Sequence, residues 1–178
     1  MNAPLLPEPA PVREPDRKLL SDIHEFGLHV VHVLPESGTP GWSFSVGLYR
    51  TRSSPEILVF GLPQPVAHHV VNELGRRAVK APLEAGQVHS ELLEGFDCIL
   101  TPVLPAWHDP FLGYALWYYQ HRSFPVLQCV WPDRNARFPW HADFFAAWRW
   151  AQPLLYLPDA REAGAEALLA SMQRGPAV

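Results

Sequence analysis

The fold is decided by three short apolar runs near the start of the chain: LHVVHVL (28–34), WSFSVGL (42–48) and EILVF (56–60). Each is rich in β-branched or aromatic residues and is bounded by Gly, Pro or Ser, a pattern typical of β-strands. In the second run large residues alternate with Ser and Gly, so one face of that strand is predicted to be buried. Because short loops join the three runs, we expect antiparallel neighbours in one sheet.

Further elements are predicted on the C-terminal and N-terminal sides of these strands. Apolar spacing predicts helices over 16–26, from 65 onward and over 111–119, and strands over 87–93, 96–104 and 124–131. Runs of strands separated by single helices are typical of an α+β domain. We therefore expect one domain, with a mostly antiparallel twisted sheet or a partly closed barrel of about six strands and three to five helices packed around it.

The ends of the chain differ from its centre. Residues 1–15 contain five prolines and are predicted to be a flexible arm, the α+β domain spans 16–157, and 158–178 forms a C-terminal helix and tail. The start shows no basic segment followed by an apolar stretch, and no run of about 18 apolar residues occurs. A cytoplasmic location, with Cys98 and Cys129 as buried free thiols, is the resulting expectation.

Charge and motifs exclude several classes of function. With 14 Lys+Arg against 18 Asp+Glu, the formal charge of −4 provides no basic surface for nucleic acid, and no membrane partner is expected. The sequence contains no Gly-x-Ser-x-Gly elbow and no phosphate-binding Gly-rich loop. His29 and His32 lie three apart in a predicted strand, hence on opposite faces, so no metal site is predicted.

Polar residues inside the apolar strands are more informative. His29, Glu56 and Gln128 are the main cases, and an unpaired buried polar group costs about 1–3 kcal/mol. Each must therefore have a partner, which is either neighbouring backbone or a ligand at which several of them converge. The sequence leaves both alternatives open.

Four of the seven tryptophans lie within residues 131–150, interleaved with proline. Trp131 and Trp140, with Trp42, could form an aromatic wall, and Asp133 could accept hydrogen bonds from indole N–H groups. This segment is either a cover over the sheet or the wall of a pocket that stacks a planar ligand. Arg50 and Arg52 could hold a phosphate through their guanidinium groups, although a solvated hairpin turn is the simpler interpretation of residues 50–54.

These motifs together resemble a known family. The segments FSVGLY (44–49), PEILVFGLP (55–63) and QCVWPD (128–133), followed by FPW (138–140), resemble the bacterial domain-of-unknown-function family 4262 over residues 16–155. The resemblance implies a stand-alone bacterial domain and transfers no catalytic residue and no cofactor. It places Gly47, Glu56, Gln128, Trp131, Asp133 and Trp140 in the recognisable motifs.

The function expected from the sequence is a small-molecule or partner-binding module with a Trp-rich pocket. Its candidate ligand-binding residues are His29, Trp42, Glu56, Gln128, Trp131, Asp133 and Trp140, with Arg50 and Arg52 as candidate phosphate ligands. One alternative is an enzyme with a flavin-type cofactor or a Glu56–His29 acid–base pair. Another is an immunity- or antitoxin-type interaction protein. The sequence assigns neither a particular cofactor nor an oligomeric state.

Overall fold

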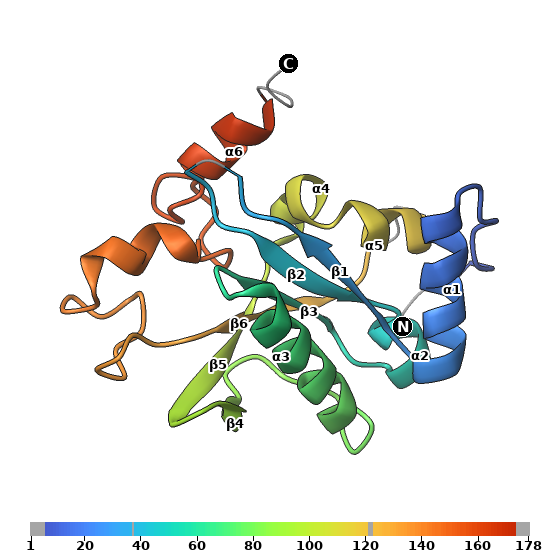
Figure 1. The fold of residues 1–178 in the computed structure, drawn as a ribbon, viewed down its shortest axis with the longest axis horizontal. Helices are drawn as coiled ribbons and strands as arrows, with labels where there is room; N and C mark the ends of the chain where they lie inside the picture. Colours follow the sequence, from blue (N-terminus) through green and yellow to red (C-terminus); the bar gives the residue numbers. More distant parts are fainter. Residues whose placement is uncertain (1–5, 37, 121–122, 174–178) are drawn as a thin grey trace.

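The computed structural model describes residues 6–36, 38–120 and 123–173 (Figure 1). Its longer helices are α1 (Glu14–Phe26), α3 (Gln64–Arg77) and α6 (Glu166–Gln173), and its shorter ones are α2 (Leu48–Arg52), α4 (His108–Phe111) and α5 (Gly113–Tyr118). The strands are β1 (His29–Val33), β2 (Trp42–Val46), β3 (Glu56–Phe60), β4 (Val88–Leu93), β5 (Phe96–Pro102) and β6 (Val126–Val130). The 3₁₀ helices η1 (Pro105–Trp107) and η2 (Ala146–Ala151) complete the elements.

The six strands form one mixed sheet in the order β1-β2-β3-β6-β5-β4, with β1 and β4 at its edges. It is open, so the partly closed barrel considered above is not formed. The first three strands are antiparallel neighbours, as the sequence predicts, and β6 is also antiparallel to β5. The exception is β6 against β3, which is parallel and aligns Glu56 with Val126 and Leu58 with Gln128.

Helices cover both faces of the sheet, so the single α+β domain has three layers (Figure 1). On one face, Phe44 and Leu58 pack with α1, α4, α5 and α6. On the other face, Ile57 and Val59 pack against α3. Alternation along β2 and β3 sends neighbouring residues to opposite cores. A side chain in one core is therefore separated by the sheet from a side chain in the other.

The segment after β2 differs from the sequence-based expectation. The sequence predicts a hairpin turn over residues 50–54, whereas residues 48–52 form the short helix α2. The chain enters this helix at Gly47, whose φ is 111°, and a Cβ there would lie 2.9 Å from Ile23 Cγ1. Glycine is the residue that accommodates both the positive φ and the close approach of α1. Helix α2 therefore connects β2 to β3 and contains Arg50 and Arg52.

Two other predicted helices are shorter or broken. The predicted helix over 111–119 is divided into α4 and α5 at Leu112, whose φ of −124° is not helical. In the C-terminal part, Asp159 accepts hydrogen bonds from the amides of Arg161 and Glu162 in a turn, and α6 begins only at Glu166. Within the described ranges, no helix has the length and apolarity needed to cross a membrane.

Candidate functional site

Glu56 lies at the start of β3, fully buried, and its carboxylate accepts four hydrogen bonds. Oε1 accepts from the amides of Gly47 at 2.9 Å and Tyr49 at 3.0 Å and from the Tyr119 hydroxyl, while Oε2 accepts from Ser45 Oγ at 2.5 Å. Ser45 Oγ in turn accepts from the Ile57 amide at 2.8 Å. The carboxylate therefore joins β2, the N-terminus of α2 and the end of α5 to β3.

The environment of Glu56 favours a structural role. Burial raises the pKa of Glu56, and the hydrogen bonds from Ser45, Tyr119 and the two amides act in the opposite direction. The side chain has no exposed surface, and both oxygens are already engaged. A group in this position holds the backbone at Gly47 and does not reach a substrate in this conformation.

His29 is hydrogen-bonded elsewhere. Its Nδ1 lies 2.7 Å from Asp22 Oδ2 of α1, so the pair joins the edge strand β1 to that helix. The hydrogen bonds to Lys18 and His29 lower the pKa of Asp22, although burial opposes them. Among the described residues, no hydrogen bond connects His29 with Glu56, and the predicted acid–base pair is not assembled.

Arg50 and Arg52 both bind backbone carbonyl groups. Arg52 donates to the carbonyls of Gly75 and Phe26, and thereby ties α2 to the ends of α3 and α1. Arg50 donates to the Leu6 carbonyl at 2.6 Å and lies 5.2 Å above the Tyr118 ring. The two guanidinium groups therefore face different neighbours and do not form the shared phosphate site that their spacing suggested.

Gln128 in β6 binds the backbone that follows η2. Its Nε2 donates to the Pro153 carbonyl at 2.7 Å, and its Oε1 accepts from the Leu155 amide at 3.1 Å. Gln152 binds Trp131 in a similar way: its Oε1 accepts from the Trp131 amide, and its Nε2 donates to the Trp131 carbonyl. The two glutamines therefore hold residues 152–155 alongside β6 by hydrogen bonds between side chains and backbone.

The predicted aromatic wall is divided between the two faces of the sheet. Trp42 packs in the core that contains Phe111, and its Nε1 donates to the Phe111 carbonyl at 2.9 Å. Trp131 packs in the opposite core, and its Nε1 donates to the Phe60 carbonyl at 2.8 Å. Both indoles are more than nine-tenths buried with their N–H groups paired, so they line no common pocket.

Asp133 organises the loop that follows β6. Its Oδ1 accepts from the amides of Asn135 at 2.8 Å and Arg137 at 3.0 Å, and its Oδ2 accepts from the Phe145 amide at 2.9 Å. Burial raises the pKa of Asp133, but the three backbone N–H donors outweigh it and the pKa is lowered. The ionised carboxylate thus holds the turn at residues 133–137 against the start of η2.

A cavity of about 430 Å³ lies between this turn and η2, and is lined by Asp133, Arg134, Asn135, Phe145 and Trp148. The Trp148 ring is supported edge-on by Trp131 at 5.7 Å and by Phe145 at 5.6 Å. The Arg134 guanidinium lies 5.9 Å from the centroid of the same ring. In the described part of the chain, the Arg134 side chain has no hydrogen-bond or ion-pair partner.

Trp140 lies apart from this cavity. It stacks on Phe138 at 4.9 Å with nearly parallel rings, and with Tyr156 and residues of β5 it borders an open hollow of about 340 Å³. Its exposed ring packs on Phe138, and the Arg149 guanidinium holds the neighbouring backbone by donating to the Pro139 carbonyl at 2.7 Å. Asp133 thus lines the cavity and Trp131 packs behind its Trp148 ring, whereas Trp42 and Trp140 lie elsewhere.

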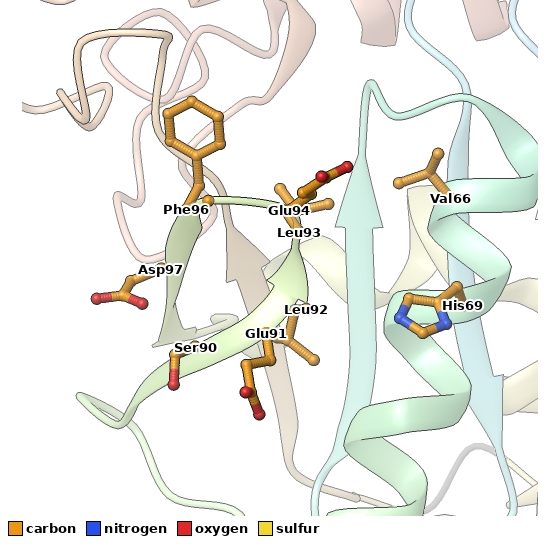
Figure 2. A pocket seen from close by; sticks show the side chains of 10 residues that line it. Val66, His69, Ser90, Glu91, Leu92, Leu93, Glu94, Phe96 and Asp97 are labelled. Atoms are coloured by element: carbon orange, nitrogen blue, oxygen red, sulfur yellow. The ribbon is translucent and has the colours of Figure 1, made fainter.

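Another hollow, of about 650 Å³, contains none of the predicted site residues. Figure 2 shows it between α3, which contributes Val66 and His69, and the β4–β5 hairpin. Its apolar part includes the buried Leu92, and exposed acidic residues of the hairpin, Glu91, Glu94 and Asp97, lie at its rim. Among the described residues, no cation–aromatic pair lies at this hollow, whereas Arg134 lies 5.9 Å from the Trp148 ring, so the Arg134–Trp148 cavity is the better candidate.

A family model described as "Domain of unknown function (DUF4262)" matches residues 22–145. The chain belongs to this family. The DUF4262 match runs from α1 through all six strands to Phe145, and so includes every residue predicted from the sequence as a site candidate. No curated protein and no solved structure matches the chain.

The structure adds residues that the sequence did not single out. Ser45 and Tyr119 complete the Glu56 network, and Arg134, Phe145 and Trp148 form most of the cavity lining. Trp148 lies in the tryptophan-rich segment, and Arg134 lies in a predicted turn. The sequence does contain a signal for Arg134, because it is a cation next to the acceptor Asp133 in a segment that also contains Trp131 and Phe138.

Proposed function

We propose that this protein is a non-catalytic binding module that holds a planar, anionic small molecule in the cavity lined by Arg134 and Trp148. The observation that carries the proposal is the guanidinium of Arg134, unpaired within the described residues, lying 5.9 Å from the ring of Trp148 in a cavity of about 430 Å³. An aromatic face beside a cation is complementary to a flat ligand with negative charge. The volume lies within the range of small-molecule sites, about 300–1,000 Å³.

The surroundings of the cavity support this proposal. Asp133 is adjacent to it, but its oxygens accept three backbone N–H groups, which reduces its repulsion of an anion. Trp131 and Phe145 hold the Trp148 ring from two sides, so little rotational freedom remains to be lost when a ligand stacks.

A bacterial origin and a cytoplasmic location remain parts of the proposal, and the buried free thiols of Cys98 and Cys129 suit a reducing compartment.

The test is a titration of tryptophan fluorescence with 2-naphthoate, a flat aromatic carboxylate, and separately with FMN. We expect 2-naphthoate to bind, and Arg134→Ala and Trp148→Ala each to weaken that binding at least about tenfold. The matched controls are Arg137→Ala and Trp150→Ala, which remove the same residue types from the same segment without touching the cavity. Tight binding of FMN, with yellow protein after purification, favours the flavin-dependent alternative.

Failure of 2-naphthoate and FMN to bind the wild-type protein at millimolar concentration contradicts the proposal. So does equal binding by wild type, Arg134→Ala and Trp148→Ala, provided that circular dichroism shows each variant to be folded. Native mass spectrometry of freshly purified protein is an independent measurement. A co-purified small molecule that is lost in Trp148→Ala supports the same site.

A second candidate function, recognition of a protein partner, is favoured by one observation. Trp140, Phe145 and Trp150 are 39%, 54% and 57% exposed, although all three lie in a segment anchored by Asp133 and Arg149. Large aromatic side chains are enriched in protein interfaces. A partner that co-purifies with wild type and with Trp148→Ala, but not with Trp150→Ala, favours this interaction function, including the immunity-type alternative.

A further inference from the structure

The N-terminal arm contacts a polar site at the opposite end of the molecule from the Arg134–Trp148 cavity. Three consecutive arm residues are bound: the Leu6 carbonyl accepts from Arg50 Nη2 at 2.6 Å, the Pro7 carbonyl accepts from Gln120 Nε2 at 2.5 Å, and the Glu8 carboxylate binds two further groups. Three separate elements, α1, α2 and the end of α5, contribute the binding groups. In Figure 1 the start of the described chain lies beside α1 and α2.

The Glu8 carboxylate is bound at both oxygens. Its Oε1 accepts from the Tyr118 hydroxyl at 2.8 Å, and its Oε2 lies 2.7 Å from His24 Nε2. Burial raises the pKa of Glu8, but hydrogen bonds from His24 and Tyr118, together with the charges of His24 and Arg50, lower it overall. The site therefore stabilises a negative charge at this position.

Arg50 adds a positive charge to the site. Its guanidinium lies over the Tyr118 ring at 5.2 Å, and its buried Nε has no partner among the described residues. A buried donor without a partner destabilises the protein, and a better-placed acceptor would remove that cost. The arm thus satisfies the site incompletely, and a ligand with a further acceptor could satisfy it better.

We infer that His24, Arg50, Tyr118 and Gln120 form a peptide-binding site for an extended segment of the type apolar-Pro-Glu, and that the protein's own arm occupies it as an internal competitor. The groups bound in Leu6, Pro7 and Glu8 are two backbone carbonyls and one carboxylate, which any such peptide presents. Proline restricts the backbone to extended conformations, so a free peptide loses little entropy on binding. The inference is independent of the Arg134–Trp148 cavity.

An internal ligand masks a site through its high effective concentration, which is about millimolar for a short tether. A peptide in solution therefore binds weakly until the arm is loosened. Glu8→Ala in the full-length chain removes both carboxylate contacts and leaves the helix start intact, because the amides of Val12 and Arg13 are held separately by Asp16. That variant should expose the site without unfolding the protein.

The test uses a fluorescein-labelled peptide of residues 4–12 and its anisotropy in the presence of full-length protein. We expect Glu8→Ala protein to bind the peptide at least about tenfold more tightly than wild type. Adding Tyr118→Phe to Glu8→Ala should weaken binding again, and a peptide that carries the Glu8→Gln substitution should bind weakly to every protein. Glu14→Ala is the matched control, since it removes an exposed acid whose one ion-pair partner among the described residues is Arg17, and it should behave as wild type.

Three results would overturn the inference, with circular dichroism confirming that each variant is folded. The first is no binding of the peptide to Glu8→Ala protein at millimolar concentration. The second is equal binding of the unmodified peptide and the Glu8→Gln peptide, which would show that the carboxylate is not recognised. The third is unchanged binding after Tyr118→Phe, which would place the peptide elsewhere.

Discussion

At the scale of single residues, the polar groups inside the sheet act mainly as structural connections. Glu56 illustrates this, because a carboxyl group in the core requires donors and receives four of them from Gly47, Tyr49, Ser45 and Tyr119. Two of these donors are the amides of Gly47 and Tyr49, at the start of helix α2. The sequence correctly marked Glu56 as a residue that must have partners, and only the structure shows that the partners are intramolecular.

Glu56→Ala should lower the free energy of unfolding by about 3 kcal/mol or more, because it leaves several buried donors without an acceptor. Urea denaturation followed by circular dichroism measures this change. Glu25→Ala, which removes an exposed glutamate of α1, is the control and should change stability by less than about 0.5 kcal/mol. A loss below about 1 kcal/mol for Glu56→Ala would contradict the role assigned to the carboxylate.

The raised pKa of Glu56 adds a pH dependence of defined sign. The native state holds this proton more tightly than the unfolded chain, where the pKa is near 4.5. Its contribution to stability is therefore fully present below pH 4.5 and is lost as pH rises through the raised pKa. Position 56 cannot titrate in Glu56→Gln. The free energy of unfolding of wild type should therefore fall relative to that of Glu56→Gln as pH rises. A difference that is independent of pH would contradict the raised pKa.

At the scale of elements, irregular segments are held by side chains that replace backbone pairing. Residues 152–155 lie along β6 through Gln128 and Gln152, and the turn at 133–137 is closed by Asp133. These amide and carboxylate groups bind the otherwise unpaired N–H and C=O groups of a proline-rich segment, which cannot form a regular ladder. The cavity between Arg134 and Trp148 owes its shape to these connections.

Gln128→Ala should destabilise the protein by about 2–4 kcal/mol, since the Pro153 carbonyl and the Leu155 amide both lose a buried partner. The same change at the exposed Gln64, at the start of α3, should have an effect below about 0.5 kcal/mol. Limited proteolysis provides a second measurement, because release of residues 152–155 should accelerate cleavage after β6. Equal stability of the two variants would show that the Gln128 contacts contribute little.

At the scale of the whole molecule, acid should destabilise the fold first through its histidines. Burial lowers the pKa of His32, His89 and His108, although Asp109 and the Val103 backbone partly oppose this for His108. The unfolded chain then binds protons near pH 6.5 while the native state does not. The stability that these neutral histidines contribute is fully present above pH 6.5 and is lost as pH falls through their lowered pKa values.

His108 provides the clearest test of this contribution. It is buried against Phe124, and its Nε2 has no hydrogen-bond partner among the described residues. In His108→Phe, the free energy of unfolding should fall less steeply between pH 6.5 and pH 5 than it does in wild type. His69→Phe, at an exposed position of α3, is the control and should keep the wild-type slope. Identical slopes for wild type and His108→Phe would contradict the prediction.

The sequence predicted most elements because their signals are local. Alternation at Trp42, Phe44 and Val46 predicts a strand, and the spacing of Leu19, Ile23 and Phe26 predicts a helix that ends at Gly27; the structure confirms both. The errors arose where nearby residues did not decide the backbone conformation. At the start of α2 the amides of Gly47 and Tyr49 donate to Glu56 of the next strand, a contact that depends on the pairing of β2 with β3. The break at Leu112 divides an apolar stretch whose local residues favour a continuous helix.

The sequence by itself determined the α+β class, the antiparallel strands β1 to β3, and the need of Glu56 and Gln128 for partners. Each follows from residues within a few positions of one another or from the cost of burying a polar group. Only the tertiary structure decided that β6 pairs in parallel with β3, that Trp42 and Trp131 lie on opposite faces of the sheet, and that Arg134 lies over Trp148. Those relations join residues far apart in the chain, so they depend on long-range register and packing, which no local pattern of residues specifies.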